Sequence, residues 1–202
     1  ESVFKDVCFG PKNQGLIEDE VKARATEALK MVGIDESLYE ASPFELSGGQ
    51  KRRVAIAGVL AMNPQILILD EPTAGLDPKG RDDILGQIAK LQKERGITYL
   101  FIAHDLSVMH YISDRIAVIH KGDIVELADA EELVTHAIHP YTRSLLSAIP
   151  MPNPRLERKK KLLVYDPAMH DYTQEAPQWR ELRPSHWVLC SEQEAKDWLA
   201  EM

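Results

Sequence analysis

The chain is poor in cysteine and has no long run of apolar residues, and both shortages exclude classes of protein. Its two cysteines, Cys8 and Cys190, lie too far apart in sequence to suggest a metal-ligand or redox pair. A reducing compartment is therefore the simplest expectation, and spacing alone leaves a disulfide open. No apolar run approaches the roughly 20 residues that a helix needs to cross a bilayer. Any work at a membrane would be done by docking.

Positive charge is scarce as well. Lys and Arg total 24 against 32 Asp and Glu, which gives a formal net charge of −8 at pH 7. A surface that coats nucleic acid needs many cationic contacts to phosphates, so we expect no nucleic-acid partner. With 202 residues, of which 44% are hydrophobic, the chain can bury a core and reads as an ordinary globular protein.

Helical periodicity and stop signals predict two helices in the first part of the chain. Apolar residues recur at helical spacing over residues 18–32, and Gly33 is placed to end that helix. A second helix should begin after Ser47, a good N-cap, and reach about Met62, where Asn63 and Pro64 end it.

Two apolar runs predict strands that are buried on both faces, as in a parallel sheet. Residues 66–69 form one continuous apolar run between turn residues, and residues 97–103 form the other. A buried helix is the alternative for the first run, but four residues are too few. Between the runs, Pro78 suits the first turn of a helix that Gly96 would close. Strand, helix and strand in this order predict a right-handed parallel crossover.

The second half should hold a β-hairpin, two short helices and a separate tail. The hairpin and helices are expected at residues 115–120, 123–127, 130–135 and 140–148. After Pro150 the chain becomes rich in proline and then basic over residues 155–161, and the rest holds all three tryptophans. We therefore divide the chain into a helical region, an α/β core and a tail that packs rather than staying disordered. Their bounds are 1–62, 63–150 and 151–202.

The turn before the second helix suits a phosphate group. Ser47, Gly48, Gly49 and Gln50 place a hydroxyl and two glycines at a helix N-terminus, where unpaired N–H groups favour an anion. Taken alone, such a turn is usually only a cap. The residues that follow favour the phosphate interpretation.

Two carboxylates follow the first predicted strand. Asp70 and Glu71 would lie at the C-terminal edge of a parallel sheet, where ligands of such folds bind. Asp70 can hold Mg²⁺ directly or through water, and Glu71 can act as the general base that polarises an attacking water. The structural alternative is a pair of solvated acids at a turn, and the apolar strand before them favours catalysis.

Two further side chains belong to the same predicted region. His104 follows the second strand and could donate a hydrogen bond to a phosphate oxygen, although a single histidine at a strand end is usually structural. Asp77 could serve the site or simply cap the next helix.

Taken in order, these motifs resemble the ATP-binding cassette (ABC) ATPases. Residues 46–104 are similar to that family's signature motif, Walker B strand, D-loop and switch histidine. The resemblance implies an α/β fold with a P-loop NTPase-type parallel sheet, a helical signature region and a small C-terminal appendage. It also implies that Ser47 to Gln50 contact the γ-phosphate of ATP on a second ATPase subunit, with Asp77 in the D-loop. Asp70, Glu71 and His104 would then serve Mg²⁺ and nucleotide on their own subunit.

One family motif is missing. The phosphate loop G-x-x-x-x-G-K-[ST] is absent, because no Gly-Lys dipeptide occurs in the 202 residues. We therefore expect an incomplete parallel sheet, the C-terminal part of a longer protein, and no ATP hydrolysis by this chain alone. Loss of the preceding strands would leave unpaired edges and bare apolar surface.

The two parts of the chain resemble different ABC importers. Residues 1–95 are similar to energy-coupling-factor ATPases for vitamins and metal ions, and residues 99–202 to oligopeptide-permease ATP-binding subunits. Recombination or an assembly artefact could place the join near Gly96. We favour oligopeptide import because the tail is the more particular feature. The resemblance implies integral membrane permease subunits as partners and a peripheral position on the cytoplasmic face of the cell membrane. Cys190 stands alone, so no cysteine-ligated cluster is predicted.

Two other functions share some of these features. A DNA-repair or chromosome-structure ATPase has the same signature and Walker B logic, but it would need a coiled-coil insertion or a basic groove, and neither is visible. A non-catalytic module that only docks on a partner, or donates a signature half-site, is favoured by the absent phosphate loop.

Overall fold

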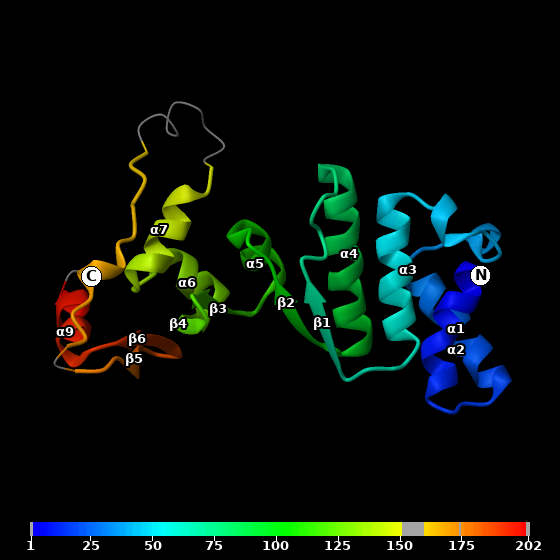
Figure 1. The fold of residues 1–202 in the computed structure, drawn as a ribbon, viewed down its shortest axis with the longest axis horizontal. Coiled ribbons are helices and arrows are strands. Elements are labelled where there is room, and N and C mark those ends of the chain that lie inside the picture. The colour runs from blue at the N-terminus through cyan, green and yellow to red at the C-terminus, as the bar shows by residue number, and fades with distance from the viewer. Residues whose placement is uncertain (1, 151–159, 174, 201–202) are drawn as a thin grey trace. The chain divides into compact units, whose positions relative to one another are not determined.

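The computed structural model describes residues 2–150, 160–173 and 175–200. By their contacts the residues group into two compact units, Glu1–Ala103 and His104–Met202, whose helices and strands are labelled in Figure 1. The three-part division made from the sequence stays a prediction. Residues 155–159 of its basic segment, 155–161, lie outside the described residues.

Three helices form the first part of unit 1. They are α1 (Val3–Asn13), α2 (Glu18–Met31) and α3 (Gly48–Leu60), and each contacts the other two. Their shared core includes Val7, Leu29 and Ala57, which are almost completely buried. Helices α1 and α3 approach closely at Gly10, where a Cβ atom would lie 2.7 Å from the Met62 side chain and 3.3 Å from the Gly58 carbonyl oxygen.

The predicted helix ends are confirmed. Helix α2 is followed by Gly33 with a positive φ of 67°. Helix α3 starts directly after its N-cap Ser47, and α4 (Pro78–Arg95) ends at Gly96, which is in the left-handed conformation with φ 61°. Glycine adopts these angles without the clash that a Cβ atom causes, so both helices stop where the sequence places a glycine.

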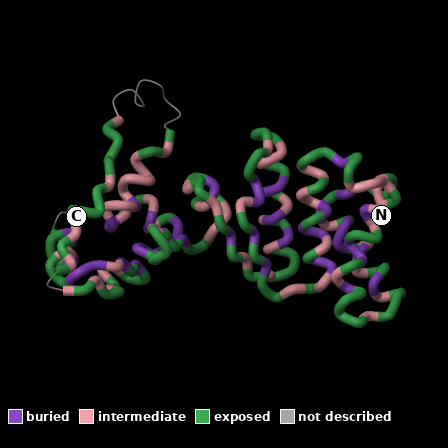
Figure 2. The backbone as a smooth tube through the Cα atoms, viewed as in Figure 1, coloured by how far each residue is buried: buried purple, intermediate pink, exposed green. Residues whose placement is uncertain are grey.

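Strands β1 (Ile66–Asp70) and β2 (Thr98–Ile102) pair in parallel, with α4 between them in sequence, as predicted. The prediction that both faces of these strands are buried is wrong for this unit. Leu67, Leu69 and Phe101 are buried, but Ile66 and Ile68 are 63% and 62% exposed, and the alternation is visible along β1 in Figure 2. Side chains of a strand alternate between two faces, and only one face of this two-stranded sheet is covered within the unit.

Unit 2 is built on a four-stranded antiparallel sheet. Its order is β3-β4-β6-β5, with strands β3 (Arg115–His120), β4 (Asp123–Asp129), β5 (Gln178–Arg183) and β6 (His186–Cys190). Among its described residues, the α-helices are α5 (Leu106–Ile112), α6 (Ala130–Thr135), α7 (Pro140–Ala148) and α9 (Glu192–Ala200). The hairpin and the two short helices confirm the sequence prediction, except that β4 continues two residues beyond Leu127 to Asp129.

The described part of the tail joins this sheet through β5 and β6, so the prediction that the tail packs is confirmed for these residues. Trp198 is buried in a cluster with Ile138, Val188 and Cys190, whereas Trp179 and Trp187 stay partly exposed. Strand β6 meets β4 in only two residue pairs. Both cysteines are free, which settles the disulfide question.

A buried ionic network supplements this short strand contact. The imidazole of His186 in β6 lies with Nε2 2.7 Å from Glu126 of β4 and Nδ1 3.2 Å from Glu132 of α6. Both His186 and Glu126 are completely buried, and Glu126 also accepts hydrogen bonds from the backbone N–H groups of Ile138 and His139. Arg183 of β5 donates to Glu132 at 2.5 Å. Ion pairs as well as strand pairing therefore hold the β5–β6 hairpin against β4 and α6.

Candidate functional site

The first turn of α3 is organised by a capping box. The Ser47 hydroxyl oxygen accepts from the Gln50 backbone N–H at 3.3 Å, and the Ser47 backbone N–H donates to the Gln50 side-chain oxygen at 2.8 Å. A second box, between Ser42 and Glu45, precedes it. These reciprocal bonds fix the turn and satisfy the N–H of Gln50. They do not use the N–H groups of Gly48 and Gly49, which an α-helix leaves without intrahelical partners.

Gly48 and Gly49 leave the surface of this turn open. A Cβ atom on either residue would meet nothing within 4 Å. The glycines are therefore not needed for packing inside the unit, and their backbone is accessible to a ligand that approaches closely. This arrangement fits an anion at the helix N-terminus, as the sequence predicts.

The two carboxylates lie at the C-terminal end of β1. Asp70 is exposed and its backbone pairs with Ile102 of β2, while Glu71 follows it and donates its N–H to the Ile102 carbonyl at 2.9 Å. Glu71 has a φ of 46°, in the left-handed region that side chains with a Cβ atom rarely adopt. The strand end is therefore followed at once by a sharp, strained change of direction.

Arg52 contacts this turn, and sequence reasoning missed it. One guanidinium nitrogen donates to the Glu71 carbonyl at 3.0 Å and another to the Ala74 carbonyl at 3.1 Å. Arg52 is on α3, two residues after Gln50, so it joins the signature turn to the segment that follows the carboxylates. The only signal in the sequence was a cation one half-turn beyond the signature motif, which is common on exposed helix faces.

Asp77 acts as the N-cap of α4, where its carboxylate accepts from the Gly80 N–H at 3.3 Å. The capping interpretation is therefore satisfied in this unit, and a role at a ligand remains a prediction. His104 is exposed and belongs to unit 2. Its proximity to Asp70 and Glu71 stays a prediction.

A magnesium ion is compatible with these residues but would need other ligands. Among the described residues there is no group of three or more His, Cys, Asp or Glu side chains placed to hold a metal ion. Mg²⁺ at phosphate-processing sites is commonly bound through one or two carboxylates together with phosphate oxygens and water. An exposed Asp70 at the end of β1 fits that arrangement. It does not fit a site in which protein side chains supply all the metal ligands.

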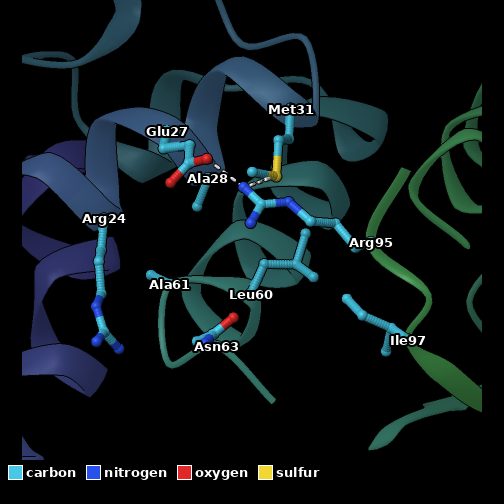
Figure 3. A pocket seen from close by; sticks show the side chains of 9 residues that line it. All are labelled: Arg24, Glu27, Ala28, Met31, Leu60, Ala61, Asn63, Arg95 and Ile97. Carbon is cyan, nitrogen blue, oxygen red and sulfur yellow. Dashed lines mark hydrogen bonds and ion pairs between the residues drawn. The ribbon is translucent and has the colours of Figure 1, made fainter. Parts of the chain in front are cut away.

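A small pocket of about 160 Å³ lies elsewhere in unit 1. Figure 3 shows it among residues of α2, the end of α3 and the end of α4, with the guanidinium of Arg95 bonded to Glu27 and close to Met31. None of the predicted site residues lines this pocket. The pocket is therefore separate from the turn that is predicted to bind phosphate.

Comparison with known proteins matches two separate parts of the chain to transporter families. The model described as ABC transporter matches residues 1–74, and the model for the C-terminal region of oligopeptide/dipeptide transporters matches residues 125–174. The oligopeptide transport ATP-binding protein OppF of Streptococcus pyogenes is 49% identical over 185 residues, which are 92% of this chain and 60% of that protein. This chain belongs to the ABC transporter ATPase family.

Other ABC proteins extend the likeness. The oligopeptide transport ATP-binding protein AmiF of Streptococcus pneumoniae is 51% identical over 177 residues, covering 88% of this chain and 58% of that protein. The solved structure of cbiO1 from Clostridium perfringens, part of the ABC transporter complex cbiONQ, has a TM-score of 0.64 and 40% identity, covering 78% of this chain and 60% of that one. A dimeric ATP-binding cassette bound to ADP and Pi has a TM-score of 0.55 and 33% identity, covering 64% of this chain and 56% of that one.

These matches confirm the α/β ABC fold and both resemblances seen in the sequence. The likeness to OppF extends over most of the chain and crosses the predicted join near Gly96. The chain spans about 60% of the length of this curated ABC relative. Within the described residues, no helix is both long enough and apolar enough to span a bilayer.

Proposed function

We propose that this chain is part of the ATP-binding subunit of an ABC importer for oligopeptides. The observation that carries the proposal is the 49% identity to an oligopeptide transport ATP-binding protein across 92% of the chain. The match of residues 125–174 to the oligopeptide/dipeptide C-terminal region supports the same substrate class. The subunit would work on the cytoplasmic face of the membrane, bound to permease subunits and to a second ATPase subunit.

The turn at the start of α3 is proposed to bind the γ-phosphate of ATP held by the second subunit. The support is its geometry, with open glycine positions and a hydroxyl fixed by the capping box. Backbone N–H groups at a helix start, together with the helix dipole, stabilise the negative charge of a phosphate. Ser47 to Gln50 would thus complete a site whose phosphate loop lies on the other subunit.

The carboxylates are proposed to act on the subunit's own nucleotide. Asp70 would bind Mg²⁺, which neutralises charge on the phosphate oxygens. Glu71 would accept a proton from the water that attacks the γ-phosphorus while the bond to the bridging oxygen breaks, yielding ADP and phosphate. His104 would donate a hydrogen bond to a γ-phosphate oxygen, and Asp77 would lie at the subunit interface.

This own-subunit chemistry needs a phosphate loop, which the 202 residues do not contain. We therefore propose that the chain alone neither binds ATP tightly nor hydrolyses it. It can still donate a signature half-site, which requires only the α3 turn. Vitamin or metal-ion uptake is a second candidate substrate class, favoured by the structural likeness to cbiO1.

A mixed-dimer assay tests the half-site. The partner is a full-length ABC ATPase of the peptide-permease type whose own signature serine is replaced by arginine, so that partner homodimers cannot turn over. Adding the chain should restore ATP hydrolysis, and Ser47→Arg in the chain should abolish the restored activity. Ser37→Arg is the matched control, because Ser37 is an exposed serine outside the turn and the added charge is the same.

Each result has a distinct meaning. No restoration with the intact chain would contradict the donated half-site and favour a module that only docks. Equal loss with Ser37→Arg would show that added charge, and not the signature turn, is responsible. ATP binding by the chain alone, or turnover that Glu71→Gln removes, would contradict the proposed lack of autonomous activity.

A further inference from the structure

The backbone of Glu71 is held in a conformation that it would not adopt unaided. Its φ of 46° is in the left-handed region, where a residue with a Cβ atom is strained. Such strain persists only where the surrounding structure enforces it. The groups that enforce it here can be named.

Three hydrogen bonds fix the Glu71 peptide groups. The Glu71 N–H donates to the Ile102 carbonyl at 2.9 Å, which ties the residue to the end of β2. The Glu71 carbonyl accepts from the Ala74 N–H at 3.1 Å and from the Arg52 guanidinium at 3.0 Å. Arg52 is the one partner in this set that comes from a helix and carries a charge.

Arg52 bonds both ends of the turn at once. Its second guanidinium nitrogen donates to the Ala74 carbonyl at 3.1 Å, so one planar group spans the carbonyls of residues 71 and 74. A guanidinium presents several N–H donors in a fixed fork, whereas an ammonium is a point donor on a flexible chain. Lysine at this position could satisfy one carbonyl but would not fix the spacing between two.

We propose that Arg52 is a positioning residue, which holds Glu71 in its strained conformation and ties it to the helix that begins with the signature turn. The assignment of Glu71 as general base and of Ser47 to Gln50 as a phosphate site rests on the proposed function. The hydrogen bonds from Arg52 of α3 to the turn at residues 71–74 do not depend on the proposed function. Arg52 touches neither nucleotide nor water in this role and acts only through the backbone of Glu71.

Amide hydrogen exchange in the intact chain tests the link. Arg52→Met should speed exchange of the Ala74 and Glu71 amides by roughly tenfold, the effect of losing a hydrogen bond to a charged group. Arg52→Lys should fall between wild type and Arg52→Met. Lys51→Met is the matched control, because it removes the neighbouring exposed cation on α3 and should leave both amides unchanged.

A second substitution separates positioning from general stabilisation. Glycine adopts a positive φ without strain, so Glu71→Gly in the Arg52→Met background should return the Ala74 exchange rate most of the way to wild type. A merely structural arginine would instead speed exchange throughout α3, including at Ala57, and Glu71→Gly would not reverse it. That result, or unchanged exchange in Arg52→Met, would overturn the proposal.

Amide hydrogen exchange is then repeated with ATP and the partner ATPase whose signature serine is replaced by arginine. This measurement distinguishes failure of the Arg52 proposal from failure of the proposed function. Protection of the Gly48 and Gly49 amides would report engagement of the half-site. Binding of ATP at the half-site should then slow exchange of the Ala74 amide in the wild-type chain but not in Arg52→Met. Equal slowing in both would overturn the proposed link through Arg52. Absence of any protection at Gly48 and Gly49 would contradict the proposed function, and the exchange rates without ATP would still decide the role of Arg52.

Discussion

At the scale of single residues, the ionisation of the buried His186 should affect the stability of unit 2. Burial disfavours the imidazolium, but the hydrogen bonds to Glu126 and Glu132 outweigh burial and raise the pKa of His186 above its ordinary value. Two carboxylates facing the two ring nitrogens require two N–H donors, so the ring is held as a cation. Arg183 and His136 also contact Glu132 and share its charge.

Stability of unit 2 should therefore fall on the alkaline side of neutrality. Because the folded-state pKa of His186 lies above the unfolded value of about 6.5, its stabilisation is complete below that pH and is lost as pH rises through the folded-state pKa. Each unit of raised pKa corresponds to about 1.4 kcal/mol. Urea unfolding of the intact chain, followed by tryptophan fluorescence from about pH 6 to about pH 9, measures the loss.

The double variant His186→Gln/Glu126→Gln should remove this alkaline fall. Replacing both partners avoids a buried unpaired carboxylate, which by itself would cost about 3–5 kcal/mol. His110→Gln is the control, since His110 is exposed and pairs with an exposed Glu131. If the double variant kept the same alkaline slope, another group would be responsible.

His139 should produce the opposite effect in acid. It is buried at the N-cap of α7, where Nδ1 accepts from the Tyr141 N–H, and burial, reinforced by His170 and His120, lowers its pKa to about 3. A histidine kept neutral in the folded state costs stability as pH falls from about 6.5 toward the folded-state pKa, by up to about 1.4 kcal/mol per pH unit. His139→Asn keeps a capping oxygen and should flatten the acid limb of the same fluorescence titration. An unchanged acid limb would show that His139 is not the group that titrates.

At the scale of elements, strand β1 has one buried and one exposed face, so substitutions on the two faces should differ in cost. Leu67→Ala should destabilise unit 1 by about 2–4 kcal/mol, because it removes a buried side chain and leaves a cavity. Ile68→Ala should cost less than about 1 kcal/mol, because its side chain is already largely in water. Urea unfolding followed by far-UV circular dichroism compares the two. If Leu67→Ala and Ile68→Ala destabilised the unit equally, at low as well as at high protein concentration, the face that carries Ile68 would be covered in solution.

The elements show how much the sequence could predict and why. Helix ends were predictable because caps such as Ser47 and stop residues such as Gly96 act within a few positions of the chain. Burial of β1 was mispredicted because an unbroken apolar run fits a strand covered on both faces, and this unit covers only one. The link from Arg52 to Glu71 spans 19 residues and that from Glu126 to His186 spans 60. No local pattern specifies which of many charged residues meet at such separations.

The candidate site also has features that the sequence could predict and features that only tertiary structure determines. The roles of Ser47, Asp70 and Glu71 were predicted from motif order, because the helix start and the strand end that carry these residues are local features of the sequence. The positions of the turn and the strand end are confirmed, and the roles stay predictions. The positive φ of Glu71 and the reach of Arg52 depend on how α3 lies against the end of β1, which only tertiary structure fixes. The relation of His104 to the carboxylates depends on contacts beyond unit 1.

At the scale of the whole molecule, the distribution of tryptophan allows the two units to be followed separately. All three tryptophans, Trp179, Trp187 and Trp198, fall in unit 2, so fluorescence reports that unit alone, whereas far-UV circular dichroism reports the helices of both. The cores are also distinct, with Leu29 in unit 1 and Leu133 in unit 2, both completely buried. Units with separate cores can unfold as separate cooperative steps.

Leu29→Ala should therefore shift the circular dichroism transition and leave the fluorescence transition in place. Leu133→Ala should lower the fluorescence midpoint, and each substitution should cost its own unit about 2–5 kcal/mol, the usual cost of removing a buried leucine side chain. Both variants, measured in urea by both probes, give a test in which each serves as the other's control. If either substitution moved both transitions together, the chain would unfold as one cooperative body. The pH effects of His186 and His139 would then appear in both probes.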